Sequence, residues 1–376
     1  MPPAVWETSG LERRGFLKGA ASGAMAAASA LAAPAIAQGL QQWRMVTSWP
    51  RGLAGVGTGA ERLAQRIGQL TGGRITVQFH AAGELVPDLE CFDAVAKGDA
   101  EIGHDAAYYH IGKTRAAPFF SSVPFGMTAD ELNAWIYFGG GQALWDEVYA
   151  PFGLKPFLAG NTGTQMGGWF RREVTAIADL KGLKVRMPGQ GGEVMAKLGA
   201  TGVTLLGGEI FKALESGAID AAEWIGPSND RDLGLHVAAK FYYYPGFHEP
   251  GAALQCMVNK ARWDALAPDL KAAVEAACAV ENGLMHAEYN ARSTEALRQL
   301  VEKHGVQLRQ WPREVLIALG NASGEIVQAI LDGDDPGARK VAEAFIGARR
   351  AAVAWTRIAD QAFANARLLQ FKYPGL

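Results

Sequence analysis

Cysteine is scarce in this sequence, and its spacing excludes several classes of site. The 376 residues hold three cysteines, Cys91, Cys256 and Cys278, an odd number with no two close together. Structural zinc sites need clustered cysteine and histidine ligands, and disulfide scaffolds need a dense, even set. We therefore expect three buried thiols that behave as small apolar side chains, although an exported protein could oxidise two of them.

An excess of one charge is also missing. The 36 lysines and arginines nearly balance the 38 aspartates and glutamates, the net charge is −2, and no basic tract stands out beyond the N-terminal region. A nucleic-acid partner is therefore not expected. Beyond the N-terminal region we expect no segment of membrane-spanning length and apolarity, so the mature chain should not itself span a membrane.

Catalytic motifs are missing as well. The sequence has neither a Gly-x-Ser-x-Gly nucleophile elbow nor the lysine and serine of a P-loop. His104, Asp105 and Ser228 could form a triad on paper, but their spacing does not support one. We expect no enzyme; the alternatives are a periplasmic hydrolase or lyase with Glu223 as base, or a ligand sensor for a small carboxylic acid.

The first 37 residues have the three parts of an export signal. A basic stretch with paired arginines, residues 12–18, precedes an apolar, alanine-rich run over 20–31, and Ala35-Ile36-Ala37 is typical of a cleavage site. The paired arginines indicate the twin-arginine route. The alternative is a chance basic, amphipathic N-terminus. We predict a cleaved signal over residues 1–37 and a soluble periplasmic protein that begins near Gln38.

The rest of the chain has the pattern of an α/β fold. A strand, a helix and a second strand are predicted first, after a glycine-rich loop at 52–59, and this order favours a parallel sheet. A helix interrupted by three glycines at 139–141 follows, and the pattern after residue 261 is mostly helical. The predicted strands are 43–48, 74–80, 153–158 and 183–187, and the predicted helices are 60–70, 129–149, 192–198, 209–215 and a long stretch over 336–369.

One pattern occurs twice. Residues 92–105 and 211–224 each give a helix, a glycine stop, a short strand and then polar residues, with matching Phe, Ala and Gly positions. Ligands of open α/β sheets gather beyond the carboxyl ends of strands. The repeat therefore favours two related lobes that face a cleft, with His104-Asp105 and Glu223-Trp224 in equivalent places. The alternative is that a helix, a glycine and a strand follow one another in many proteins, so that the repeat does not indicate related lobes.

Several side chains at expected strand ends suit the binding of an anion or a cation. Arg186 ends a predicted strand before Pro-Gly, where a guanidinium can hold a carboxylate with two hydrogen bonds, although a surface ion pair is the usual role of arginine. Gln165 and Glu223 are hard oxygen donors that suit Na⁺ or Ca²⁺ when a tryptophan carbonyl joins them. The plainer interpretation of Glu223 is a solvated turn carboxylate. The tyrosine clusters at 108–109 and 242–244 are, by the plainer interpretation, residues of the core or of an interface.

A family resemblance rests on long segments of the mature chain. They are "VTSWP", "GAERLAQRI", "AAGELVP", "GHDAAYY", "PFFSSVPFGM", "NTGTQMGGWF", "DLKGLKVRMPG", "GGEIFKALESGAIDAAEWIGPSND" and "YYYPGFHEPG", together with the exported N-terminus. With them the chain resembles the solute-binding proteins of tripartite ATP-independent periplasmic (TRAP) transporters. It looks most like the branch that binds 2-oxo acids and lactate-like monocarboxylates with a cation.

The resemblance implies a two-lobe periplasmic-binding-protein fold, with a hinge and a long C-terminal helix. Lobe 1 would comprise residues 38–160, with part of 250–335 returning to it, and lobe 2 residues 161–249. Residues 336–376 would hold the long helix, which this branch exchanges between the two subunits of a homodimer. Val341, Phe345, Ala348, Ala352 and Trp355 lie on roughly one apolar side of that helix.

The resemblance also implies roles for particular residues. Arg186 would bind the carboxylate of a small organic acid. Gln165, Glu223 and Trp224, the last through its carbonyl, would hold the Na⁺ or Ca²⁺ ion, and Glu249 would join that shell. The pocket would be lined by Asn161, Tyr108 and Tyr109.

One position departs from the family pattern. Ser228 stands where this branch would have an aromatic residue after "EWIGP". If that position contacts the solute, the pocket is wider or more polar than usual.

The closed protein would dock on the membrane subunits of the transporter.

Overall fold

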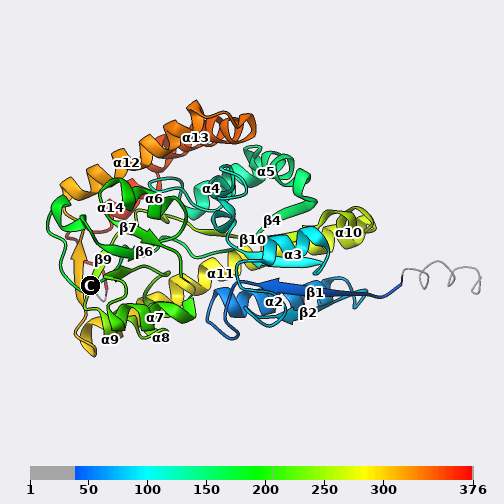
Figure 1. The fold of residues 1–376 in the computed structure, drawn as a ribbon, viewed down its shortest axis with the longest axis horizontal. Helices are drawn as coiled ribbons and strands as arrows, with labels where there is room; N and C mark the ends of the chain where they lie inside the picture. Colours follow the sequence, from blue (N-terminus) through cyan, green and yellow to red (C-terminus); the bar gives the residue numbers. More distant parts are fainter. Residues whose placement is uncertain (1–38, 206, 375–376) are drawn as a thin grey trace, which may run out of the picture. The chain divides into compact units, whose positions relative to one another are not determined.

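The predicted strand, helix and strand open the first of two β-sheets (Figure 1). The computed structural model describes residues 39–205 and 207–374, so the predicted export signal lies outside the described residues. From Gln42 onward the chain forms one compact unit that contains both sheets. The expectation of an α/β fold is therefore confirmed.

The first sheet combines parallel and antiparallel pairs. Its strand order is β2-β1-β3-β10-β4; β1 and β3 are parallel, whereas β10 runs antiparallel to β3 and β4. The late strand β10 returns between two early strands, so this sheet is assembled from distant parts of the sequence. Its members are β1 Gln41–Thr47, β2 Ile75–His80, β3 Ile102–Asp105, β4 Leu154–Asn161 and β10 Ala253–Asn259.

The second sheet takes the middle of the chain and one late strand. Its order is β11-β9-β5-β8-β6-β7, in which β6 is parallel to β7 and β8, and β5 is antiparallel to β8 and β9. The strands are β5 Gly168–Phe170, β6 Lys184–Arg186, β7 Thr201–Val203, β8 Ala221–Ala222, β9 Phe241–Tyr244 and β11 Gln307–Gln310.

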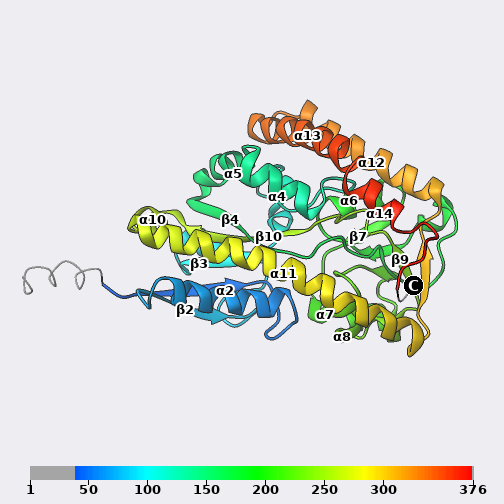
Figure 2. The ribbon, with the colours of Figure 1, turned by 180° about the vertical axis from the view of Figure 1, so that it is seen from behind.

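Helices cover both sheets, and the longer ones bury an apolar face, as their periodicity requires. The long helix α11 lies against α2 and β4 at one end and α8 at the other, and so runs along both sheets (Figure 2). The helices of the first half are α2 Val56–Leu70, α3 Cys91–Lys97, α4 Ala129–Phe138, α5 Gly141–Tyr149, α6 Gly189–Lys197 and α7 Gly207–Ser216. The later ones are α8 Pro227–Asp232, α9 Leu235–Ala238, α10 Lys260–Asp264, α11 Pro268–Glu302, α12 Arg313–Asp332, α13 Pro336–Thr356 and α14 Asp360–Ala366. Short 3₁₀ helices in the described part of the chain are η1 Ala107–His110, η2 Ala117–Phe120, η3 Ala150–Phe152 and η4 Ile177–Leu180.

The repeated pattern forms the same structure twice. Gly98 follows α3 and Gly217 follows α7, both with positive φ, which glycine adopts without the strain that a side chain would cause. The strands that follow, β3 and β8, each pair in parallel with a neighbour. Asp105 thus ends β3, and Glu223 comes directly after β8.

Two segments cross between the sheets side by side. Residues 162–167 lead from β4 to β5, and residues 245–252 lead from β9 back to β10. Backbone hydrogen bonds tie them together: Thr162 donates to Ala252, Gln165 to Glu249, and Gly246 to Gln165. We call these two segments the paired crossovers. They hold the point where the chain passes from one sheet to the other.

Two expectations about helices were wrong. α2 begins at Val56, inside the stretch predicted as a glycine-rich loop. α12 is long and apolar enough to cross a membrane, although no such segment was expected. Its buried residues recur on one face, which packs on α6 and α13, so packing against these helices accounts for its apolar character.

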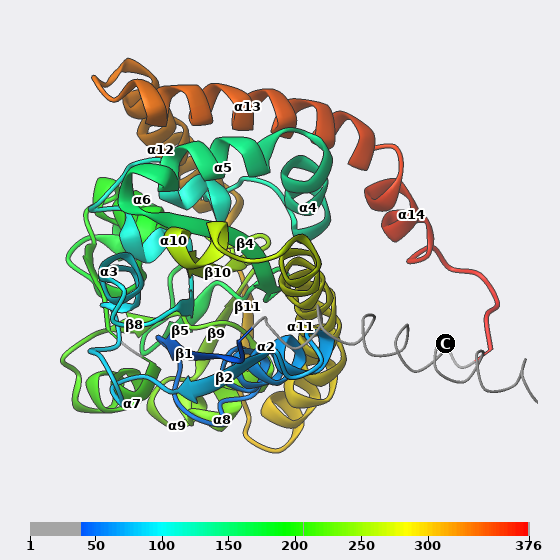
Figure 3. The same ribbon diagram turned by 90° about the vertical axis from the view of Figure 1, so that its right-hand side faces the viewer.

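The predicted C-terminal stretch is two helices and not one. α13 packs on α4, α5 and α12, and the shorter α14 continues beyond them (Figure 3). Of the predicted apolar side, Val341 and Phe345 are buried, whereas Trp355 is 65% exposed.

The three cysteines are buried and unpaired, as expected.

Candidate functional site

Two adjacent strand ends of the second sheet bring together a buried ion pair. Arg186 ends β6 and Glu223 follows β8, its parallel neighbour. Arg186 Nη1 donates to the Glu223 carbonyl at 2.8 Å and to its Oε1 at 2.5 Å. Both side chains are 1% exposed. Neither is therefore the surface group that the plainer interpretations predicted.

Trp224 completes this side of the site. The Arg186 guanidinium lies 5.0 Å from the centre of the Trp224 ring, which is a cation–π contact. Carbonyl groups on either side of Trp224 are occupied, since Glu223 accepts from Arg186 and Ile225 accepts from Met166. Among the hydrogen bonds of the described residues, none uses the Trp224 carbonyl. That oxygen remains available as the donor that the sequence predicted.

The paired crossovers add Gln165 and Glu249. Gln165 Nε2 donates to Glu249 Oε2 at 2.6 Å and to Thr162 Oγ1 at 3.0 Å. The other end of the same amide, Gln165 Oε1, is buried with no hydrogen-bond partner among the described residues. A buried acceptor without a donor is costly, and a cation would compensate it.

The first sheet contributes the tyrosine pair. Tyr108 and Tyr109 lie in η1, directly after β3, and their rings meet edge to face at 4.9 Å. Tyr108 OH donates to Glu249 Oε2 at 3.5 Å, at the limit of a hydrogen bond. A residue that follows the first sheet therefore reaches the paired crossovers at Glu249.

Asn161 is near these groups but is occupied in a structural role. It ends β4, where its Oδ1 accepts from Gly163 N at 2.8 Å and its Nδ2 donates to the Gly251 carbonyl at 3.3 Å. The amide thus links the two crossovers. Ser228, the position that departs from the family pattern, is buried in α8.

His248 is a member of the site that the sequence analysis did not name. Its Nε2 lies 3.1 Å from Glu223 Oε2, and the residue is 2% exposed. The available signal was its place beside Glu249 in "YYYPGFHEPG". One donor atom from each of Glu223, His248 and Glu249 lies within 4.8 Å of the others, an arrangement that could hold a metal ion.

Burial and charge set the ionisation of the cluster. Burial, and then the Glu223 carboxylate, raise the pKa of Glu249 well above its usual range. Burial lowers the pKa of Arg186, but Glu223 and the neighbouring tyrosines outweigh it, so the pKa is raised and the guanidinium stays charged. Burial raises the pKa of Tyr108 well above its usual value. Two carboxyl groups and one guanidinium therefore share a dry space, which suits a cation.

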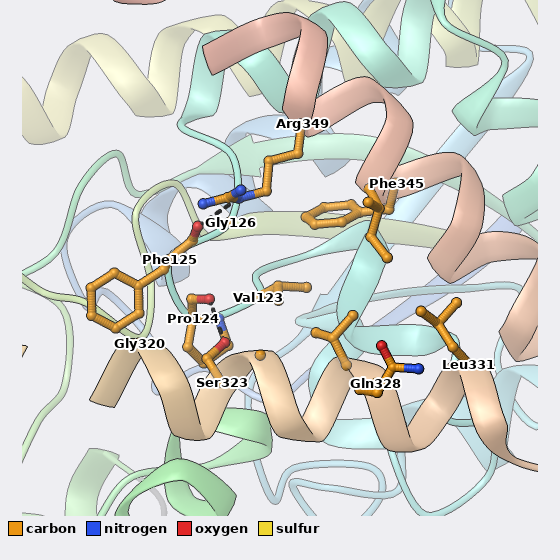
Figure 4. A pocket seen from close by; sticks show the side chains of 13 residues that line it. Val123, Pro124, Phe125, Gly126, Gly320, Ser323, Gln328, Leu331, Phe345 and Arg349 are labelled. Atoms are coloured by element: carbon orange, nitrogen blue, oxygen red, sulfur yellow. Dashed lines mark hydrogen bonds between the residues drawn. The ribbon is translucent and has the colours of Figure 1, made fainter. Parts of the chain in front are cut away.

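A separate cavity of about 360 Å³ lies away from these residues, between α12, α13 and the loop 123–126 (Figure 4). Arg349 Nε donates to the Phe125 carbonyl at 2.8 Å, and Ser323 Oγ donates to the Pro124 carbonyl at 2.7 Å. Its polar groups are thus largely engaged with the loop, and the rest of the lining is mostly apolar. This cavity is not lined by several charged side chains, as the cluster around Arg186 is.

Comparison with protein families and known proteins gives consistent matches. The family described as bacterial extracellular solute-binding protein, family 7, matches residues 49–334. A monocarboxylate 2-oxoacid-binding periplasmic protein of Nostoc sp. is 44% identical over 324 residues, which cover 86% of this chain and 88% of that protein.

Solved structures match over nearly their whole length. A TRAP transporter solute-binding protein of Bordetella bronchiseptica, a dimer with copurified calcium and picolinate in one site, is 39% identical with a TM-score of 0.85. The match covers 88% of this chain and 97% of that one. A TRAP periplasmic solute-binding protein of Pseudoalteromonas atlantica with bound sodium and pyruvate is 37% identical, with a TM-score of 0.84 and coverage of 88% and 99%.

Proposed function

Because the chain belongs to the bacterial extracellular solute-binding proteins of family 7, we propose that it captures a small organic monocarboxylate together with a cation in the periplasm. The solute is a 2-oxo or 2-hydroxy acid, and the cation is Na⁺ or Ca²⁺. As a TRAP solute-binding protein, the chain is a transport component and not an enzyme. It delivers the acid to the membrane subunits of the transporter.

One observation carries the proposal. Arg186, Glu223 and Glu249 are almost fully buried and meet at the paired crossovers, with Gln165 Oε1 unpartnered beside them. Such a concentration of charge is expensive to bury without a function. An organic anion and a metal cation together would balance it.

Each group then has a part in binding. Arg186 uses Nε and Nη1 for the Leu205 and Glu223 contacts, and its Nη2 makes no hydrogen bond among the described residues. Nη2 would donate to the carboxylate of the acid. Glu223, Gln165 Oε1 and the Trp224 carbonyl would hold the cation. Glu249 would join them.

The cation supplies positive charge that polarises the oxygens of the acid. Hard oxygen donors of this kind suit Na⁺ and Ca²⁺. Tyr108 and Tyr109 would line the solute side of the pocket, with Asn161 behind them. His248 would hold Glu223 from the side opposite Arg186. The chain's own residues thus bind and orient the solute, and exclude water from it.

We propose a lobe division that is supported by the two sheets. Lobe 1 would comprise residues 38–160 with part of 250–335, and lobe 2 residues 161–249. The paired crossovers would be the hinge, since both segments pass between the sheets there. Closure would remove water and strengthen the ionic contacts.

Two further parts of the proposal concern export and assembly. The signal over residues 1–37 would direct the folded chain through the twin-arginine route. Residues 336–376 would form the contact of a homodimer. The support is a set of exposed apolar side chains near the C-terminus: Trp355, Ile358, Phe363, Leu368, Leu369, Phe371 and Tyr373.

The test of the solute site is the Arg186→Ala variant. Pyruvate and lactate are titrated into the wild type and the variant by calorimetry, with Ca²⁺ present. We expect the variant to lose detectable binding because the buried carboxylate of the acid would have no cationic partner. Retained wild-type affinity in a folded variant would contradict the assignment.

A further inference from the structure

Gln190 is a buried amide in the first turn of α6. The residue is 2% exposed, and neither Nε2 nor Oε1 makes a hydrogen bond among the described residues. Most buried polar side chains in proteins are paired, because an unpaired amide loses its bonds to water without replacement. The glycine-rich sequence at the start of α6 predicts that a helix begins there. It gives no reason for a glutamine at position 190.

The neighbours of Gln190 place it at the solute site. A Cβ on Gly189 would lie 3.2 Å from Cβ of Tyr108, and one on Gly191 would lie 2.9 Å from Cβ of His248. Successive residues of a helix are turned by about 100°. Gln190 lies between these two glycines in the first turn of α6, one residue from each contact, and it follows Arg186 by only four residues. The first turn of α6 is a wall of the site.

Other unpartnered atoms lie in the same cluster. Gln165 Oε1, Trp224 Nε1 and His248 Nδ1 are buried without hydrogen-bond partners among the described residues. Gln165 Oε1 suits a cation because it is a bare acceptor. Gln190 differs, since its amide offers donors and an acceptor together. A hydroxyl group, which also both donates and accepts, matches both ends of that amide.

We propose that Gln190 binds the solute directly and selects acids that carry a hydroxyl group beyond the 2-oxo or 2-hydroxy carbon. This inference rests on the proposed function. Arg186 and the cation hold the carboxylate end, which all such acids share. Gln190 contacts the other end of the acid. A methyl group of the acid at that place would leave the Gln190 amide without a hydrogen-bond partner.

The test compares acids that differ in one hydroxyl. Pyruvate against 3-hydroxypyruvate and lactate against glycerate are titrated by calorimetry into the wild type, Gln190→Leu and Gln190→Met. We expect the wild type to bind the hydroxylated acid of each pair about tenfold more tightly, the value of one or two buried hydrogen bonds. In both variants the preference should fall below about twofold, because their side chains are similar in size but apolar.

A second readout separates solute binding from a structural role. Without solute, the variants should melt at a higher temperature than the wild type, since an unpaired buried amide destabilises the fold. A lower melting temperature in both variants would overturn the proposal, because it would show that the amide is paired within the protein. A wild type without the hydroxyl preference, or variants that keep it, would also overturn it. If no acid binds the wild type at all, it is the proposed function that fails.

Discussion

Arg186 and Glu223 balance each other in the absence of solute, so each should be expensive to remove. Replacing Glu223 by Gln keeps the shape but leaves the guanidinium with less compensation, at a cost of about 3–5 kcal/mol in unfolding free energy. It also removes one charge from the cation shell, and Ca²⁺ affinity should fall by at least about tenfold. Calorimetric titration of Ca²⁺ and denaturant unfolding measure the two effects.

The matched control for that experiment is Glu325→Gln. Glu325 pairs with Lys197 at 2.8 Å on the surface and is 65% exposed. Surface pairs contribute little, so stability and Ca²⁺ affinity should both stay near the wild-type values. If Glu223→Gln also behaved in this way, Glu223 would not hold the cation.

Asp230 gives a prediction about pH. Burial raises its pKa to about 6, against the bonds from Tyr242, Trp169 and the Ile225 backbone, which lower it. A carboxyl group whose pKa is raised on folding stabilises the protein below its unfolded pKa and loses that contribution as pH rises through the folded value. Between about pH 4 and pH 6, Asp230 should therefore lower the unfolding free energy of the wild type by roughly 3 kcal/mol.

The comparison with Asp230→Asn isolates this effect, since asparagine does not titrate. The variant should be destabilised, because Trp169 and Tyr242 both donate to Asp230 Oδ2 and would then face an amide nitrogen. The unfolding free energy of the variant should lie below that of the wild type, and the difference between them should shrink as pH rises from 4 to 7. Urea unfolding at each pH measures it. If the destabilisation instead grew with pH, the hydrogen bonds from Tyr242, Trp169 and the Ile225 backbone would outweigh burial in setting the pKa of Asp230.

At the site, sequence reasoning reached residues that carry a local signal. Arg186 and Glu223 could be found because each stands where a short apolar strand meets a turn. Gln165 could be proposed as a hard oxygen donor, whereas Glu249 came from the resemblance alone. The contact between them could not be predicted, since the two residues lie on crossovers 84 residues apart in sequence. His248 and Gln190 were missed because only burial and neighbours distinguish them from ordinary loop and helix residues.

At the scale of elements, the paired crossovers should depend on backbone contact at Gly246. A Cβ there would lie 2.3 Å from the carbonyl oxygen of Gln165, which cannot move without shifting the site. Gly246→Ala should lower the unfolding free energy by about 1–3 kcal/mol and weaken solute binding. Thermal unfolding and calorimetry measure both.

Gly283→Ala is the control for that substitution. Gly283 lies in α11, where an added Cβ meets nothing within 4 Å. Alanine should there raise stability by about 0.5–1 kcal/mol and leave binding unchanged. If Gly246→Ala behaved like this control, the close approach of the crossovers would not shape the site.

The elements with strong periodicity were predicted well, and those set by distant contacts were not. The helix predicted over 129–149 is indeed divided at its glycines into α4 and α5. β10 and β11 join sheets with partners far away in sequence, and no local pattern gives that pairing. α12 was not recognised as apolar enough to span a membrane, because its length was hidden in a generally helical region.

For the whole molecule, the C-terminal segment gives a prediction about assembly. The apolar side chains of α14 and the residues after it are exposed, and Leu368 is 81% exposed. A patch of this kind on an isolated subunit indicates a contact with another chain. We expect the mature protein to be a dimer and a version that ends at Thr356 to be a monomer, measured by light scattering after size exclusion.

The control for the truncation is its ability to bind solute. The site residues lie far from residue 357 in sequence and on other elements, so the shortened protein should still respond to pyruvate and Ca²⁺. A wild type that is monomeric at micromolar concentration, or a truncated protein that remains dimeric, would contradict this assembly.

The most direct test of the central claim, binding of a small carboxylate together with a cation, is the melting temperature of the mature protein. It is measured with pyruvate, longer 2-oxo acids, lactate and aromatic acids, each with Na⁺, Ca²⁺ or a chelator. A solute that binds only the folded state raises the melting temperature by mass action. We predict a rise with 2-oxo or 2-hydroxy acids that the chelator, in sodium-free buffer, abolishes. No rise with any acid in the presence of either cation would contradict the account.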